Sequence, residues 1–303
     1  LLTSVGYDLT FATALVAVSG SLGIIIPPSI PYIMYCNASG ASISELFLAG
    51  FLPGVLIALC LMVYSYIYCK IHGEDKDKLN AKCMELRAKG LGTVLKEGFW
   101  ALMSPVIILG GIYGGICSPT EAATISIFYS LIVSLFIYRT IKIRDLPKIM
   151  LEGIHSYAPI LIILSAAVAF ARVITLMNVA TIVSEAVLSA ISSKVVILLL
   201  INVLLLFVGM IMDTGPAILV FPPVLLPVAE AIGVDPIHFG IIMVVNLAIG
   251  FVTPPLGVNL FVACNVANAK LEEICKGIFP IVGVMILDLL LITYIEPLSM
   301  LLP

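Results

Sequence analysis

Long apolar stretches separated by short polar connections run along the whole chain. An α-helix rises about 1.5 Å per residue, so many of these stretches are long enough to cross most or all of about 30 Å of hydrocarbon. The pattern predicts helices over 10–26, 30–38, 47–68, 99–117, 122–138, 160–177, 179–192, 195–212, 217–232, 237–249 and 279–295. We therefore expect an all-α polytopic membrane protein.

Two apolar stretches are interrupted by a proline pair, and the two interruptions are in register. Pro27-Pro28 and Pro254-Pro255 lie 227 positions apart, each shortly after a glycine. A proline pair removes two amide donors and clashes with the preceding turn, so both stretches are predicted to be broken helices. The same spacing relates Gly6 to Gly233, Asp8 to Asp235, Glu45 to Glu272, Gly50 to Gly277 and Pro53 to Pro280. The chain is thus expected to contain two repeats.

Composition and charge place these helices in a lipid bilayer. Hydrophobic residues make up 61% of the chain and charged residues 11%, with a mean hydropathy of +1.21, which is more apolar surface than a soluble domain buries. Positive charges gather in the connections 70–97 and 139–148, which two predicted crossings separate. Both connections are therefore expected on the cytoplasmic side. We expect the chain to lie in a lipid bilayer and to have no nucleic-acid partner.

The segment 195–233 is predicted to be a re-entrant hairpin with its tip at 212–216. A turn sequence, Asp213-Thr214-Gly215-Pro216, separates its arms, and the short second arm carries three prolines. Two full spans joined by an ordinary loop are the alternative. Both interpretations leave the repeats antiparallel, the inverted topology of many secondary transporters. The corresponding hairpin of the first repeat is expected upstream of Leu1.

The breaks are candidate binding sites because a broken helix exposes backbone groups within the membrane. Carbonyl oxygens at one half-helix end suit a small cation, and amides at the other end suit a carboxylate. Ser29, Thr253 and Asn259 add side-chain oxygens, and glycines permit close backbone approach. A purely structural kink is the alternative at each break. Asp213 either attracts a cation or caps the following half-helix.

Other polar residues within apolar stretches have simpler interpretations. Arg172 either extends to the outer interface or meets a carboxylate substrate in a cavity. Asp288 lies inside the last apolar helix, where a structural partner or a scaffold contact is expected rather than a transport role. Ser118 and Glu121 have the spacing of a capping box, with Pro119 at the first helical position.

Longer motifs resemble those of the large membrane subunit of TRAP transporters. They are GGIYGGICSPTEAA at 110–123, MIMDTGPAIL at 210–219 and the two broken segments at 23–29 and 250–257. The resemblance covers essentially the whole chain and is greatest for sialic-acid systems. It implies the ion-transporter superfamily fold, with two inverted repeats, each with a hairpin and a broken helix, and an elevator-like motion.

The resemblance also implies partners, ions and site residues. A small four-helix membrane subunit, separate or fused, and a periplasmic substrate-binding protein are expected in a bacterial inner membrane, with sodium as the coupling ion and no other cofactor or metal. The implied sodium ligands, by backbone or side chain, are Gly23, Ile26, Pro27, Pro28, Ser29, Met212, Asp213, Thr214, Gly215, Gly250, Thr253, Pro254 and Gly257. The implied substrate contacts are Ser29, Thr214, Pro255, Asn259 and Arg172.

These expectations divide the chain into five segments. Residues 1–69 complete the first repeat, 70–97 form a cytoplasmic connector, 98–193 are scaffold helices, 194–269 form the transport domain, and 270–303 form a C-terminal scaffold helix. The expected function is sodium-coupled import of an organic acid, and sialic acid is the first candidate. No enzyme activity is expected. The alternatives are a C4-dicarboxylate permease, a stand-alone sodium/dicarboxylate symporter, a channel, and an intramembrane aspartyl protease built on Asp213 and Asp288.

Overall fold

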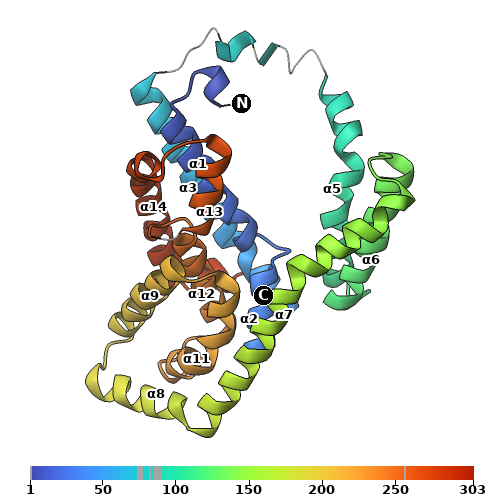
Figure 1. Cartoon of the computed structure of the whole chain (residues 1–303). Helices are drawn as coiled ribbons and strands as arrows, with labels where there is room; N and C mark the ends of the chain where they lie inside the picture. Colours follow the sequence, from blue (N-terminus) through green and yellow to red (C-terminus); the bar gives the residue numbers. More distant parts are fainter. Residues whose placement is uncertain (1, 74–77, 82, 85–89, 256) are drawn as a thin grey trace. The chain divides into compact units, whose positions relative to one another are not determined.

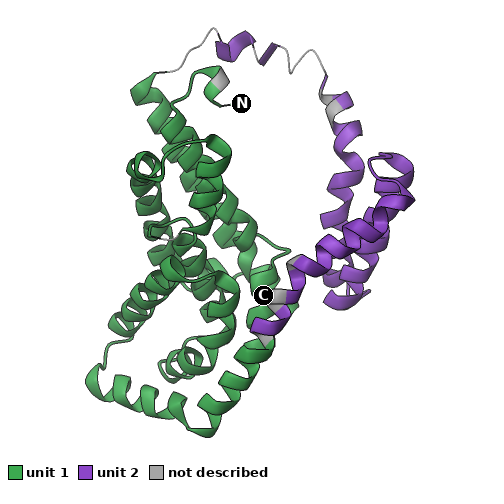
Figure 2. Cartoon of the chain, in the orientation of Figure 1, with its two compact units in different colours: residues 1–75, 164–303 green, residues 76–163 purple. Residues whose placement is uncertain are grey.

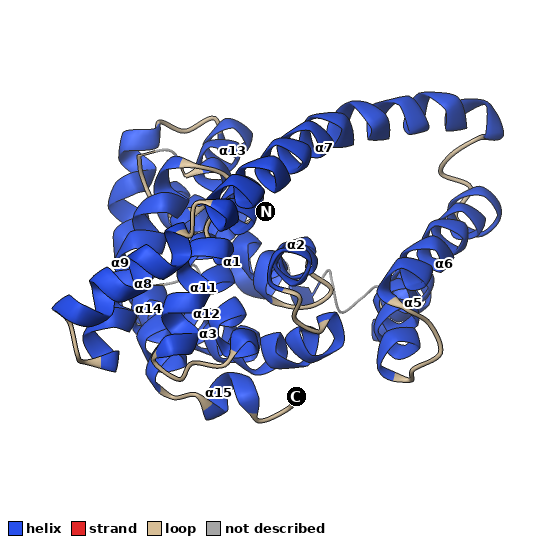
Figure 3. Ribbon diagram, turned by 90° about the horizontal axis from the view of Figure 1, so that it is seen from below, coloured by secondary structure: helices blue, strands red, loops and turns tan. Residues whose placement is uncertain are grey.

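The protein is described by a computed structural model in which all residues except 1, 74–77, 82, 85–89 and 256 are placed. The described residues form helices and loops with no strand among them (Figure 3). The α-helices are α1 (Leu9–Ile25), α2 (Ile30–Ser39), α3 (Ile43–His72), α5 (Leu91–Tyr113), α6 (Pro119–Ile132), α7 (Leu146–Leu176), α8 (Val179–Ala190), α9 (Lys194–Ile211), α10 (Thr214–Val220), α11 (Pro222–Ala231), α12 (Pro236–Gly250), α13 (Val258–Ala267), α14 (Leu271–Tyr294) and α15 (Pro297–Met300) (Figure 1). Three short segments complete the list: η1 (Thr3–Val5), η2 (Val133–Ile137), a π-helix, and η3 (Ile143–Asp145).

The helices confirm a polytopic membrane protein. Within the described residues, five helices are long and apolar enough to span a bilayer, or up to eight spans if each bent pair of helices is one span. Contacts divide the chain into two compact units (Figure 2): unit 1 contains residues 1–75 and 164–303, and unit 2 contains residues 76–163. Part of the predicted connector 70–97 lies outside the described residues, and α3 extends into it as far as His72.

Unit 2 is built on the pair α5 and α6. The predicted capping box is present: Ser118 Oγ accepts from the Glu121 amide, and the Glu121 carboxylate accepts from the Ser118 amide. Helix α5 ends at Tyr113, earlier than expected, because Gly114 caps it and Gly115 takes a left-handed φ of 65°. The Tyr129 hydroxyl donates to the Trp100 carbonyl at 2.7 Å and joins the two helices.

Unit 1 contains the matching segments of the two predicted repeats, α1–α2–α3 and α12–α13–α14. Their first helices begin alike. Asp8 accepts a hydrogen bond from the Phe11 amide at 3.0 Å, and Asp235 accepts one from the Ile237 amide at 2.7 Å. Each aspartate therefore supplies an N-cap to its helix. Gly6 and Gly233, two residues earlier, both have positive φ, as the reversal before the cap requires.

The two broken helices run antiparallel, which confirms the inverted topology. Near the end of α2, Tyr35 donates to the Pro236 carbonyl at the start of α12 at 2.7 Å, and its ring lies 6.5 Å from that of Phe239. Near the end of α1, a methyl group at Gly20 would lie 3.4 Å from Asn259 Nδ2, at the start of α13. Each half of one broken helix thus lies beside the opposite half of the other.

The segment after α8 is a helical hairpin, with α9 as its first arm and α10–α11, bent by 58°, as its second. Lys194 Nζ donates to the Gly233 carbonyl at 3.0 Å, so the two ends of the hairpin lie together. Near the tip, Gly209 of α9 packs directly on Gly250, the last residue of α12. The tip therefore lies level with the second break, and α13 continues past that level. This geometry favours the hairpin over two full spans.

Helix α14 packs against α1, α3 and α12. A buried polar chain joins it to the hairpin: Asn246 Nδ2 of α12 donates to Asn202 Oδ1 of α9 at 2.9 Å, and Asn202 Nδ2 donates to Thr293 Oγ1 of α14 at 3.0 Å. Interhelical hydrogen bonds of this kind strengthen helix association in membranes. Hairpin, broken helix and α14 therefore form one packed body. The predicted segment boundaries stay predictions.

Candidate functional site

The first break separates α1 from α2, which are bent by 43° relative to each other. The peptide bond between Pro27 and Pro28 is cis. Because Pro28 has no amide hydrogen, the carbonyl of Ile24 lacks its usual helical donor, and the hydroxyl of buried Ser29 donates to it instead. Among the described residues, no hydrogen bond reaches the carbonyl oxygens of Gly23 or Ile25. The end of α1 therefore presents backbone oxygens that its own loop does not satisfy.

The second break, between Gly250 and Val258, satisfies more of its carbonyls internally. Thr253 Oγ1 donates to the Ile249 carbonyl at 2.7 Å, and the Thr253 amide donates to the Gly250 carbonyl at 3.0 Å. The Asn259 amide donates to the Phe251 carbonyl at 3.1 Å across the loop. The Pro254–Pro255 bond is cis here too, and Gly257 takes a left-handed φ of 46°. The two breaks thus share a shape and differ in the hydrogen bonding of their carbonyls.

The hairpin tip lies next to both repeats. Asp213 accepts a hydrogen bond from the Thr214 amide at 2.7 Å, which is the predicted cap, and its side chain is otherwise exposed. Thr214 is 5% exposed, and its hydroxyl has no partner among the described residues. A methyl group at Gly215 would lie 3.5 Å from Met34 Cε of α2, on the far side of the first break.

The structure thus places the hairpin tip beside the second break and beside α2 of the first repeat. Gly250 lies against Gly209 and against the Met210 amide just before the tip, and α10 packs on α2. Arg172 is exposed on α7, and no described hydrogen bond or ion pair joins its side chain to a break or the tip. Pro255 is exposed, and Asn259 faces Gly20 of α1.

The carboxylates of the protease alternative have different surroundings. Asp288 is 2% exposed within α14, with the thiol of Cys60 as its neighbour on α3. Asp213 is exposed at the hairpin tip. An aspartyl protease needs two carboxylates close enough to share a proton. These two are not arranged as such a pair.

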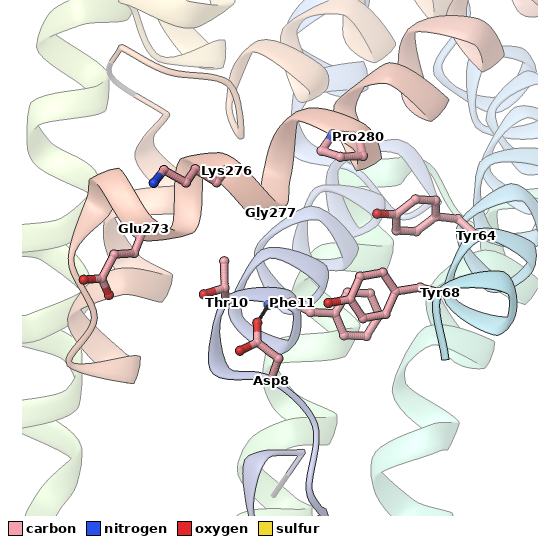
Figure 4. A pocket seen from close by; sticks show the side chains of 9 residues that line it. All are labelled: Asp8, Thr10, Phe11, Tyr64, Tyr68, Glu273, Lys276, Gly277 and Pro280. Atoms are coloured by element: carbon pink, nitrogen blue, oxygen red, sulfur yellow. Dashed lines mark hydrogen bonds between the residues drawn. The ribbon is translucent and has the colours of Figure 1, made fainter. Parts of the chain in front are cut away.

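Sequence reasoning missed a hollow between α1, α3 and α14 (Figure 4). It has a volume of about 420 Å³ and lies where α1 and α14 begin and α3 ends, away from the breaks. Its lining residues are Asp8, Thr10, Phe11, Tyr64, Tyr68, Glu273, Lys276, Gly277 and Pro280. The rings of Tyr68 and Phe11 stack at 3.8 Å. The i, i+4 spacing of Tyr64 and Tyr68 was the signal available in the sequence.

Sequence reasoning also missed a second hollow, of about 740 Å³, along α1 and α13. Its lining is mainly small and apolar, and it includes Gly20 and Asn259. Asn259 is therefore accessible from this side of the broken helices. The side chains of Asn202 and Asn246, which hold the hairpin arm to α12, were not singled out either, because an isolated asparagine in an apolar stretch does not reveal its partner.

Inverted repeats with paired broken helices, and a hairpin tip against one of them, define the class of secondary-transporter permeases. Residues 1–298 match the family of the DctM component of tripartite ATP-independent periplasmic transporters, and the chain belongs to this family.

Curated relatives carry different substrate names. The chain is 45% identical over 298 residues to the isethionate TRAP transporter permease protein DctMQ of Oleidesulfovibrio alaskensis, covering 97% of this chain and 46% of that protein. It is 38% identical to the C4-dicarboxylate TRAP transporter large permease protein DctM of Pseudomonas aeruginosa, and 34% identical to the sialic acid TRAP transporter large permease protein SiaM of Vibrio cholerae, covering 98% of this chain and 68% of each relative. The chain thus spans about half of the first relative and about two thirds of the others.

Proposed function

We propose that this chain is part of the transport core of a TRAP permease that couples sodium entry to uptake of an organic acid across a bacterial inner membrane. The observation that carries the proposal is the hairpin tip lying against the second break, with the first repeat's α2 packed beside it. Such a meeting point offers carbonyl oxygens to a cation, and hydroxyls and amides to an anion.

The proposed partners are a small four-helix membrane subunit and a periplasmic substrate-binding protein. The family's description as a tripartite transporter supports both. The name of the relative DctMQ supports a fused form of the small subunit.

The proposed substrate class is a small organic acid with one or two carboxylates or a sulfonate. Isethionate, C4-dicarboxylates and sialic acid all occur in the names of relatives. Identity is higher to the isethionate relative than to the sialic acid relative, so isethionate replaces sialic acid as the first candidate.

The proposed transport step moves unit 1's hairpin, broken helices and α14 as one body, in an elevator-like motion. The polar chain through Asn202, Asn246 and Thr293 supports this grouping. Helix α14, which the sequence assigned to the scaffold, is thereby proposed to move with the site.

The test is uptake by the complete complex in proteoliposomes. Labelled isethionate, succinate and sialic acid are supplied with and without a sodium gradient, and with and without the binding protein. Sodium-dependent, saturable uptake that requires the binding protein supports the proposal. Uptake without that protein supports a stand-alone symporter, and simple conductance supports a channel.

Substituting Thr253 or Asp213 by alanine is expected to raise the sodium concentration for half-maximal uptake several-fold. Thr253→Ala frees the Ile249 carbonyl and removes a side-chain oxygen at the break, and Asp213→Ala removes the only carboxylate of the tip. Sodium titration of uptake measures both effects.

Matched controls separate ion binding from local stability. Thr175→Ala removes a hydroxyl that bonds the Ala171 carbonyl at 2.9 Å on exposed α7, and Asp235→Ala removes an equivalent N-cap at the base of α12. Neither control should change sodium dependence. If both site variants behave like their controls, the assignment of these ligands is wrong.

A further inference from the structure

Tyr32, in the first turn of α2, has a buried hydroxyl that the fold leaves unused. The side chain is 0% exposed, and its hydroxyl oxygen has no hydrogen-bond partner among the described residues. A hydroxyl shielded from water and left unpaired is costly, so such a group points to a ligand. Tyr35, one turn further along the same helix, pairs its hydroxyl with the Pro236 carbonyl.

The unpaired hydroxyl lies beside the open end of α1. A methyl group built on Gly50 of α3 would lie 2.9 Å from the Tyr32 hydroxyl oxygen and 3.1 Å from the Ile25 carbonyl oxygen. The two oxygens therefore both border the space over the Gly50 Cα, and they lie at most about 6 Å apart. The Ile25 carbonyl is among those that no described hydrogen bond reaches at the first break.

The repeat relationship gives independent support. Tyr32 and Asn259 lie 227 positions apart and occupy equivalent places, in the first turn after each break. Both side chains carry oxygen, although one is aromatic and the other an amide.

We propose that the Tyr32 hydroxyl oxygen is a ligand of the coupling sodium ion at the first break, together with the Ile25 carbonyl. This inference rests on the proposed sodium-coupled transport and adds a residue that the motifs do not indicate. Half-helix carbonyls supply oxygens to sodium in broken-helix transporters, and the neutral phenol oxygen completes such a set. Gly50 has no side chain, so α3 can approach closely without displacing either oxygen.

The main experiment compares the wild type, Tyr32→Phe and Tyr35→Phe in the complete complex reconstituted in proteoliposomes. Tyr32→Phe keeps the ring and removes only the oxygen. We expect its half-maximal sodium concentration to rise about tenfold, which corresponds to about 1.4 kcal/mol of lost binding, with the substrate KM at saturating sodium unchanged. Tyr35→Phe should lower thermal stability and leave the sodium titration as in the wild type.

The outcomes are distinguishable. If wild-type uptake does not depend on sodium, the proposed function fails. If the wild type depends on sodium and Tyr32→Phe has the same titration, the inference fails and Tyr32 has a packing role. An equal shift in Tyr35→Phe also overturns it, because the effect would then belong to α2 as a whole.

A second variant acts on the same oxygens without touching Tyr32. Gly50→Ala places a methyl group 2.7 Å from Tyr32 Cε2 and 3.1 Å from the Ile25 carbonyl, so it should displace both oxygens and weaken sodium binding. Gly283→Ala, at an open position of α14, is its control. Unchanged sodium affinity in a folded Gly50→Ala protein contradicts the proposal; if that variant does not fold, Tyr32→Phe decides.

Discussion

Replacing Gly250 by alanine is expected to abolish uptake and to destabilise unit 1. The added methyl group would lie 2.5 Å from both the Cα and the carbonyl carbon of Gly209, and 2.9 Å from the Met210 amide nitrogen. These are backbone atoms, which cannot rotate away, so the hairpin arm must separate from α12. Overpacking of a well-packed interface costs about 1–3 kcal/mol, and a backbone clash belongs at the upper end or above. Thermal unfolding of the purified complex and sodium-dependent uptake measure the two effects.

Two further glycine substitutions test whether the loss of stability follows the closeness of the added methyl group's contacts. Gly209→Ala meets Gly250 and Leu247 at 3.1–3.2 Å, so a small shift accommodates it and the loss should be smaller. Gly283→Ala, in α14, meets nothing within 4 Å and should stabilise its helix by about 0.5–1 kcal/mol. The expected order of thermal stability is therefore Gly283→Ala, Gly209→Ala, Gly250→Ala. A Gly250→Ala protein as stable and active as Gly283→Ala would show that hairpin and second break are not in contact.

The repeats, the breaks and the inverted topology could be predicted because backbone-determining residues encode them. Pro27-Pro28 and Pro254-Pro255 end helices through lost donors and steric clash, wherever the chain lies in space. The aspartate caps and the box at Ser118 are similarly local. Helix ends shifted by a few residues where glycine turns intervene, as at Gly115.

What the sequence did not reveal depends on pairs of residues far apart in the chain. The contact of Gly209 with Gly250 and the proximity of Tyr32 to Ile25 through Gly50 require the folded arrangement. The hydrogen bond between Asn202 and Asn246 is of the same kind. Local patterns report which residues are apolar or polar, whereas a binding site depends on which of them meet.

Replacing Pro27 and Pro28 together by alanine is expected to stabilise the helix and to impair transport. The new amide at position 28 can donate to the Ile24 carbonyl, and that at position 27 to the Gly23 carbonyl, as in a continuous helix. Each proline in a helix interior costs about 3 kcal/mol relative to alanine, so removing both favours a continuous helix across the break. A continuous helix withdraws the open carbonyls from the proposed sodium site. We expect uptake to fall at least tenfold while thermal stability is unchanged or higher.

The control for this pair is Pro105→Ala, which removes an exposed proline inside α5, where the helix is not broken. It should gain stability without affecting uptake. The opposing changes in stability and uptake are the informative result, because a variant that merely misfolds loses both. Transport at the wild-type rate by a more stable Pro27→Ala/Pro28→Ala protein would show that the first break is a structural kink. The binding role of exposed backbone carbonyls would then rest on the second break alone.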